Sequence, residues 1–185
     1  MSRRMTIAKY SEQWPLQAES EILLLRRALG GEMLDAHHIG STAVPGLAAK
    51  PVIDILLVVQ STDRLDERDD AMKSMGYLPR REMGIVGRRY YVKGGDRRTH
   101  HVHAFAFGDS HIEAHLAFRD YLREHPSIAA DYARIKCEAA RRFEENPEGY
   151  VAYKHDFVER AVADALHWSR QNTRGQSDAI EEDLL

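Results

Sequence analysis

The sequence predicts a single α/β (α+β) domain in which a β-sheet comes first and a cap of helices follows. Two observations carry this prediction. Apolar, strand-like segments alternate with glycine-containing turns as far as residue 107, and three helix-like segments follow from Ser110 onward. The length of 185 residues fits one domain with one substantial core.

The composition indicates a soluble, cytoplasmic protein. Apolar residues make up 43% of the chain and charged residues 30%, and no apolar stretch is long enough to span a bilayer. A single cysteine, Cys137, excludes an internal disulfide and a zinc cage built from cysteines. The net charge of −3 gives no general attraction to nucleic acid or membrane, so a small phosphorylated ligand is the expected partner. Nothing indicates an oligomeric state.

The first half of the chain alternates between helices and strands. The apolar spacing from Trp14 to Leu29 predicts a helix, which ends at a pair of glycines. A short strand follows from Met33 to Ile39, and the nearly continuous apolar segment from Val52 to Val59 predicts a central strand buried on both faces. A further helix is expected from Asp63 to Met75.

A hairpin and the helical cap make up the second half. Strands over 88–92 and 101–107 flank a basic, glycine-containing loop, and they are expected to pair antiparallel. Helices are expected over 112–124, 128–144 and 148–168, with breaks at Pro126 and Pro147. We therefore expect one domain over 1–174 and an acidic, flexible tail over 175–185.

The functional argument starts from a turn followed by a buried acid. In the turn, Gly40 allows close approach of the backbone to a phosphate, and the hydroxyls of Ser41 and Thr42 can donate to its oxygens. Asp54 lies in the apolar strand, where a carboxylate needs a partner such as a divalent cation. The alternative is a structural role, in which Asp54 accepts backbone donors or pairs with Lys50.

At this point a resemblance to a known family becomes specific. The segment from His38 to Ile55, which reads HIGSTAVPGLAAKPVIDI, resembles the signature of the GrpB-like family. Matching pieces elsewhere are Tyr10 with Trp14, His101-Val102-His103, the segment 118–126, and Tyr150 with Lys154. The resemblance implies a nucleotidyltransferase-like fold, with a mixed sheet flanked by helices, in proteins whose biochemical role is mostly undefined. In some bacteria a similar domain is joined to dephospho-coenzyme A kinase, but this chain has no kinase P-loop.

The wider nucleotidyltransferase superfamily carries two acids separated by one residue, and here one of them is missing. Asp54 matches one acid, but Val52 and Leu56 occupy the two positions at which its partner would stand. This departure puts the usual two-metal arrangement in doubt. His101 and His103 alternate along a later strand and share one face, so they could complete a mixed site with Asp54 for Mg²⁺ or Mn²⁺, more than for Zn²⁺. Alternatively, the two imidazoles form a hydrogen-bonded polar pair or act as a base.

Basic residues of the predicted cap are candidates for phosphate contacts. Arg119 and Arg123 lie one helical turn apart, and Lys154 lies on the last helix. The alternative is internal pairing of the arginines with Asp120 or Glu124, or exposure to solvent. The basic run around the hairpin, which includes Arg88, is interpreted as a solvated surface or the lip of an acidic-ligand site. His111 and His115 share a helix face and are interpreted as surface or core residues.

Two functions compete on these observations. The first is an enzyme that transfers a nucleotidyl or phosphoryl group to a small acceptor, with Asp54, His101 and His103 as its catalytic and metal-binding residues. The second is a noncatalytic module that binds a nucleotide or a coenzyme-A-like ligand and assists a partner enzyme. A third, purely structural role gains if the turn and Asp54 only close an internal ion pair.

Overall fold

The structure, a computed structural model, describes residues 6–182 of the chain. Within them, five strands form one mixed sheet in the order β1-β2-β5-β4-β3. The strands are β1 (Met33–Ile39), β2 (Ile53–Val59), β3 (Tyr77–Pro79), β4 (Arg89–Lys93) and β5 (His100–Ala106). β2 and β5 run parallel, and every other neighbouring pair is antiparallel. The expected antiparallel pairing of the two hairpin strands is confirmed.

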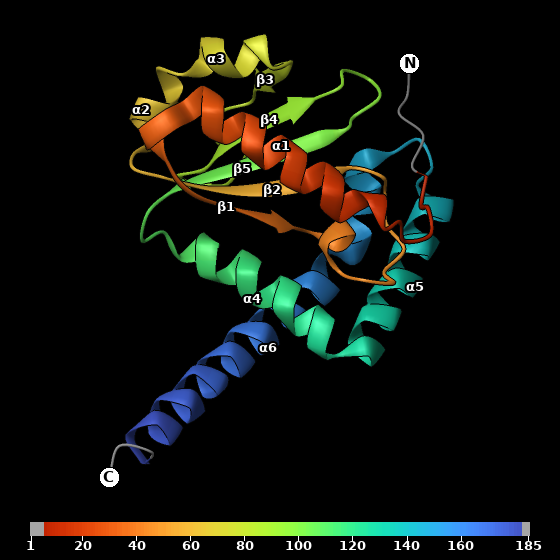
Figure 1. Ribbon diagram of the computed structural model, residues 1–185. Helices are drawn as coiled ribbons and strands as arrows, with labels where there is room; N and C mark the ends of the chain where they lie inside the picture. The colour runs from red at the N-terminus through yellow and green to blue at the C-terminus, as the bar shows by residue number, and fades with distance from the viewer. Residues whose placement is uncertain (1–5, 183–185) are drawn as a thin grey trace.

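Helices cover both faces of the sheet, which confirms the α+β fold class. They are α1 (Gln13–Leu29), α2 (Thr62–Asp66), α3 (Asp69–Ser74), α4 (Ser110–Glu124), α5 (Pro126–Arg142) and α6 (Pro147–Glu182). Figure 1 shows α1 and α4 on opposite sides of the sheet, with α5 and part of α6 at the end of the sheet where β1 stops. No helix among residues 6–182 has the length and apolar character needed to cross a membrane.

Burial explains why β2 is apolar almost throughout. On the α1 side, Ile55 and its alternate neighbours pack with Trp14 and Leu25 of the helix. On the other side, Leu56 packs with Ile39 and Phe105 beneath α4. Both faces of the strand are therefore out of water, as the sequence predicted for a central strand.

The helical cap is anchored to the segment between β1 and β2. Val44 and Leu47 of that segment are buried against Leu122 of α4 and Tyr132 of α5. A short bridge between Ala8 and Ala49 fixes the other side of the segment. The turn that carries the candidate site is thus held between the sheet and the cap.

Three features of the secondary structure differ from the sequence-based expectation. The single helix expected over 63–75 is two helices, separated at residues 67 and 68. Asp69 begins α3, and its carboxylate accepts from the Tyr91 hydroxyl and pairs with Arg81. The short edge strand β3 was not predicted. The last helix continues past Trp168 to Glu182, which covers most of the expected tail; residues 183–185 lie outside the described residues, and the flexibility of that segment stays a prediction.

Candidate ligand-binding site

Gly40 and Asp54 form the centre of the candidate site. Gly40 directly follows β1 and has a φ of 71°, a conformation that L side chains rarely adopt. A Cβ atom at this position would lie 2.6 Å from Oδ2 of Asp54. The turn therefore needs glycine for two reasons, its backbone conformation and its contact with the carboxylate.

The two histidines of β5 converge on the same carboxylate. The parallel register places His101 opposite Asp54 and His103 opposite Leu56, so both imidazoles lie on the α4 side of the sheet. Nδ1 of His101 is 3.0 Å from Oδ1 of Asp54, and Nε2 of His103 is 3.6 Å from the same oxygen. The three side chains remain 27%, 20% and 15% exposed for Asp54, His101 and His103, so solvent reaches the group.

The histidines keep Asp54 ionised. Burial by itself would raise the pKa of the Asp54 carboxyl, but the hydrogen bonds and charges of His101 and His103 outweigh burial and hold this pKa below its usual range. Asp54 is thus a carboxylate whose charge is met by two imidazoles. The two imidazoles contact Asp54, and no hydrogen bond joins them to each other among the described residues.

Arg88 and Tyr90 of the basic hairpin, for which the sequence left a solvated surface or the lip of an acidic-ligand site open, contact the two histidines. Tyr90 lies opposite His103 in the hairpin, and its ring centroid is 5.5 Å from that of His101 and 5.0 Å from that of His103. Nη1 of Arg88 is 3.5 Å from Nδ1 of His103, and only 7% of Arg88 is exposed. The correct register of β4 against β5 would have revealed Tyr90, because directly opposite residues share a face.

A third histidine extends the cluster from α4. The ring centroid of His115 is 5.3 Å from that of His103 and 5.9 Å from that of Phe105. Burial lowers the pKa of His115 to about 3, with smaller effects from nearby charged groups. Its neighbour one turn earlier, His111, stacks on Phe105. His115 therefore packs against the sheet, whereas 43% of the His111 side chain is exposed, so His111 is a surface residue that packs on Phe105.

The two hydroxyl residues of the turn, Ser41 and Thr42, differ in their exposure to solvent. Thr42 is buried, and its Oγ1 lies 2.9 Å from Nε2 of His38. His38 is opposite Ile55 and hence on the α1 side, and burial lowers its pKa to about 4. Thr42 and His38 therefore hold the turn together from within. Ser41 is only half-buried, and it is the turn hydroxyl that can reach a ligand.

The two arginines of α4 contact the protein's own backbone. Nε and Nη2 of Arg123 donate to the carbonyl oxygen of Ala43, at 3.0 Å and 2.8 Å. Arg119 donates to the carbonyl oxygen of His38 at 3.3 Å, and both arginines pair with Asp120. The internal pairing considered from the sequence is what these contacts describe, and the arginines brace the turn.

Lysines from the cap and from the segment between β1 and β2 lie near aromatic rings of the cap. The ammonium groups of Lys50 and Lys154 lie 3.8 Å and 6.0 Å from the centroid of the Tyr150 ring. Lys136 is 2% exposed and donates to the carbonyl oxygen of Ala48 at 2.7 Å. Burial, reinforced by the charge of Lys154, lowers the pKa of Lys136 to about 7. The sequence analysis did not single out Lys136, because a lysine at helical spacing gives no sign of burial.

These residues do not fit the two-cation centre that the superfamily pattern implies. Such a centre needs paired carboxylates, and Val52 and Leu56, the residues two positions from Asp54, are buried aliphatic side chains. Within residues 6–173, whose side chains are described, no group of three histidine, cysteine, aspartate or glutamate residues is arranged to hold a metal ion. The site is a hydrogen-bonded carboxylate–imidazole group.

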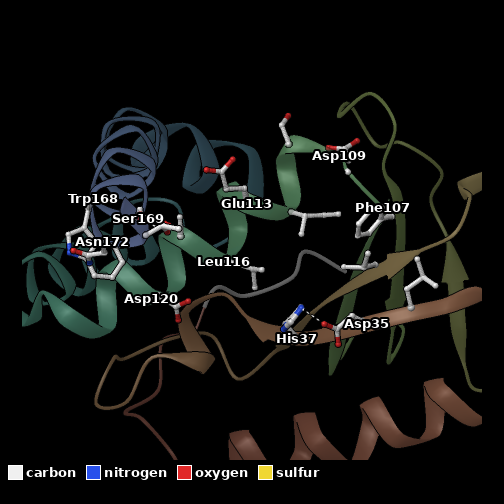
Figure 2. A pocket seen from close by; sticks show the side chains of 17 residues that line it. Asp35, His37, Phe107, Asp109, Glu113, Leu116, Asp120, Trp168, Ser169 and Asn172 are labelled. Atoms are coloured by element: carbon white, nitrogen blue, oxygen red, sulfur yellow. Dashed lines mark hydrogen bonds and ion pairs between the residues drawn. The ribbon is translucent and has the colours of Figure 1, made fainter. Parts of the chain in front are cut away.

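A cleft lies on another part of the molecule. A cleft of about 1210 Å³ opens between β1, α4 and α6, and none of Gly40, Ser41, Asp54, His101 or His103 lines it. Figure 2 shows Asp35 and His37 of β1 on one side of this cleft and Glu113 and Trp168 of the helices on the other. The cleft and the carboxylate–imidazole group are separate features.

Fold and site together define an α+β protein with a glycine turn and a strand carboxylate, in which one acid of a nucleotidyltransferase-type pair is absent. The sequence matches the model of the GrpB protein family over residues 4–164, and the chain belongs to this family. The nucleotidyltransferase-like fold implied by the family agrees with the mixed sheet and its helical cap.

Known relatives extend this assignment. The UPF0157 protein YqkA of Bacillus subtilis is 42% identical over 94% of this chain, and the chain spans 51% of that protein, about half its length. The dephospho-CoA kinase of Mycobacterium tuberculosis H37Rv is 34% identical over 84% of this chain, which spans 46% of the kinase. The crystal structure of the conserved protein GrpB from Enterococcus faecalis superposes with a TM-score of 0.85, at 38% identity, over 89% of this chain and 99% of that one.

Proposed function

We propose that this chain is a noncatalytic module that binds a nucleotide- or coenzyme-A-like phosphorylated ligand beside Asp54. One observation carries the proposal: Asp54 is a lone carboxylate held by two imidazoles, with buried Val52 and Leu56 where its acidic partner would stand. Cation-assisted transfer needs carboxylates that are free to bind cations. Binding of a phosphate does not, because backbone N–H groups, hydroxyls and lysines suffice for it.

The groups around the turn support recognition of an anion. Ser41 is the half-buried hydroxyl of the turn, and the backbone after Gly40 begins a short 3-10 turn. Lys50 and Lys154 flank the Tyr150 ring nearby. The buried Lys136 has a pKa of about 7, so a bound anion could favour its protonated, charged form at neutral pH. A phosphate bound here would be met by lysines, and a base or acyl group could contact the aromatic rings.

The relatives narrow the class of ligand. In the mycobacterial proteins named dephospho-CoA kinase, a region similar to this chain accounts for somewhat less than half of the length. A module carried by such a kinase would meet adenine nucleotides and coenzyme A precursors. We therefore place coenzyme A, dephospho-coenzyme A and ATP first among the ligands, with the module assisting a partner enzyme.

Calorimetry tests this proposal directly. Wild-type protein titrated with ATP, coenzyme A and dephospho-coenzyme A, in buffer with EDTA, is expected to bind at least one of them. Lys154→Gln should weaken that binding by about tenfold, the equivalent of about 1.4 kcal/mol. Arg160→Gln is the matched control on the same helix, because Arg160 donates only to a backbone carbonyl of its own helix. No binding of any of the three compounds would contradict the proposal.

A turnover assay separates binding from transfer. The competing hypothesis, metal-dependent nucleotidyl or phosphoryl transfer, requires Asp54 to bind Mg²⁺ or Mn²⁺, with His101 and His103 as further ligands or as a base. We expect no metal-dependent product from the wild type when ATP and the other nucleotides are supplied with either cation. Product that forms with the wild type and disappears in Asp54→Asn would establish the enzyme instead of the module.

A further inference from the structure

The solvent-facing side of α1 carries an apolar stripe that the fold leaves uncovered. Leu16, Leu23 and Leu24 are 54%, 52% and 47% exposed, and their spacing of seven and eight residues puts them on one side of the helix. Arg26 and Arg27 follow in the last turn and are exposed as well. Single exposed leucines are common, but three lie on one face here, with the exposed Glu19 between Leu16 and Leu23 and the two arginines at the end of the stripe. This surface suits an apolar partner that carries acids at one end.

The cleft between β1, α4 and α6 has the complementary character. Apolar side chains form much of its wall, among them Leu34, which is 45% exposed, and Phe107, which is 77% exposed. No lysine or arginine is among its described lining residues. Four carboxylates line it, namely Asp35, Asp109, Glu113 and Asp120. Figure 2 shows these acids distributed along the cleft between the strand and the two helices.

Two of these acids have no permanently charged partner. Asp35 pairs with His37 at 3.1 Å and Asp109 with His111 at 2.8 Å, so their partners are imidazoles and not permanently charged groups. Glu113 pairs with Arg170, and Asp120 pairs with both Arg119 and Arg123, so these two acids already have arginine partners. An arginine brought to the rim would therefore meet Asp35 and Asp109, which lack a full counter-charge.

We propose that the cleft receives helix α1 of a second copy of this chain. The leucines of the stripe would cover Leu34 and Phe107, and Arg26 and Arg27 would lie beside Asp35 and Asp109. α1 and α4 cover opposite sides of the sheet (Figure 1). Two molecules therefore cannot each place α1 in the cleft of the other. The contact is head-to-tail, and it builds a closed ring or a chain of molecules. It does not depend on the proposed ligand site, because neither surface includes that site.

Sedimentation velocity tests the association. Wild-type protein between roughly 10 and 500 μM is expected to form species larger than the monomer, and these should decrease at high salt. Leu23→Glu on the stripe and Asp35→Lys in the cleft should each leave the protein monomeric. Leu78→Glu and Asp70→Lys make the same two changes at exposed positions elsewhere and should associate like the wild type. Far-ultraviolet circular dichroism checks folding, and Arg27→Glu is a second stripe variant in case Leu23→Glu does not fold.

Mixing the two disabled variants gives the sharpest result. Leu23→Glu keeps an intact cleft and Asp35→Lys keeps an intact stripe, so an equimolar mixture should form a one-to-one dimer and nothing larger. A wild type that stays monomeric at every concentration would overturn the proposal. So would association that survives both variants, or a mixture of the two that stays monomeric, since the interface would then lie elsewhere or be symmetric.

Discussion

At the scale of single residues, the contact between Gly40 and Asp54 has the largest consequences. The carboxylate can lie against the turn only because position 40 has no side chain, and Oδ2 occupies the space next to a would-be Cβ. The other carboxylate oxygen then faces the imidazole of His101. Removing the glycine should therefore disturb the turn, Asp54 and the histidine together.

Gly40→Ala tests this coupling, with Gly46→Ala as its matched control. Both glycines have a positive φ, 71° and 76°, but a Cβ at Gly46 would meet nothing within 4 Å. We expect Gly46→Ala to cost about 1 to 2 kcal/mol of unfolding free energy from backbone strain. Gly40→Ala should cost at least about 1 kcal/mol more, because the methyl group must displace the carboxylate. Urea unfolding measures both, and equal losses would contradict a contact with Asp54.

The sequence predicted part of this site, for identifiable reasons. Asp54, His101 and His103 could be brought together because a glycine turn, a buried strand and an alternating pair of histidines each have a local signature. Arg88, Tyr90 and His115 could not, since their positions depend on the register of the hairpin and on where α4 packs against the sheet. Lys136 was missed because its burial is a property of the docked cap.

At the scale of elements, cations of the cap hold the turn by its carbonyl groups. Arg119 and Arg123 on α4 and Lys136 on α5 donate to backbone oxygens on either side of the glycine turn. Sequence periodicity predicted α4 and α5 but could not tell whether their basic residues faced a ligand, an acid or the backbone. The contacts explain why the cap and the turn should respond to mutation as one unit.

Arg123→Ala measures this connection, with Arg134→Ala as the control on α5. Arg123 makes two charge-assisted hydrogen bonds to Ala43, but 38% of its side chain is exposed, so we expect a loss of about 1 to 2 kcal/mol. Arg134 makes one exposed pair with Asp131 within its helix, and its removal should cost less than about 0.5 kcal/mol. Urea unfolding supplies the values. A loss for Arg123→Ala as small as that of the control would show that the cap does not depend on this contact.

At the scale of the whole molecule, the buried lysine makes stability depend on pH. In the folded protein burial lowers the pKa of Lys136 from 10.5 to about 7, so between these values the unfolded chain holds a proton there that the folded chain lacks. Whenever the unfolded state binds more protons, the free energy of unfolding rises with pH. Lys136 should thus contribute a rising slope from about pH 7 toward pH 10.5, and its full penalty should apply below pH 7.

Lys136→Met makes this slope measurable. A difference of one proton corresponds to about 1.4 kcal/mol per pH unit, so we expect the wild type to gain on the variant by roughly 1 kcal/mol per unit between pH 7.5 and 9. Tyr77, Tyr91 and Tyr150, whose pKa values burial raises, act in the opposite direction near and above pH 10 and are common to both proteins. Urea unfolding across this range gives the two curves. Parallel curves would mean that Lys136 keeps its proton in the folded protein, because the Ala48 carbonyl and the Tyr132 ring, whose centroid is 4.5 Å away, compensate for its burial.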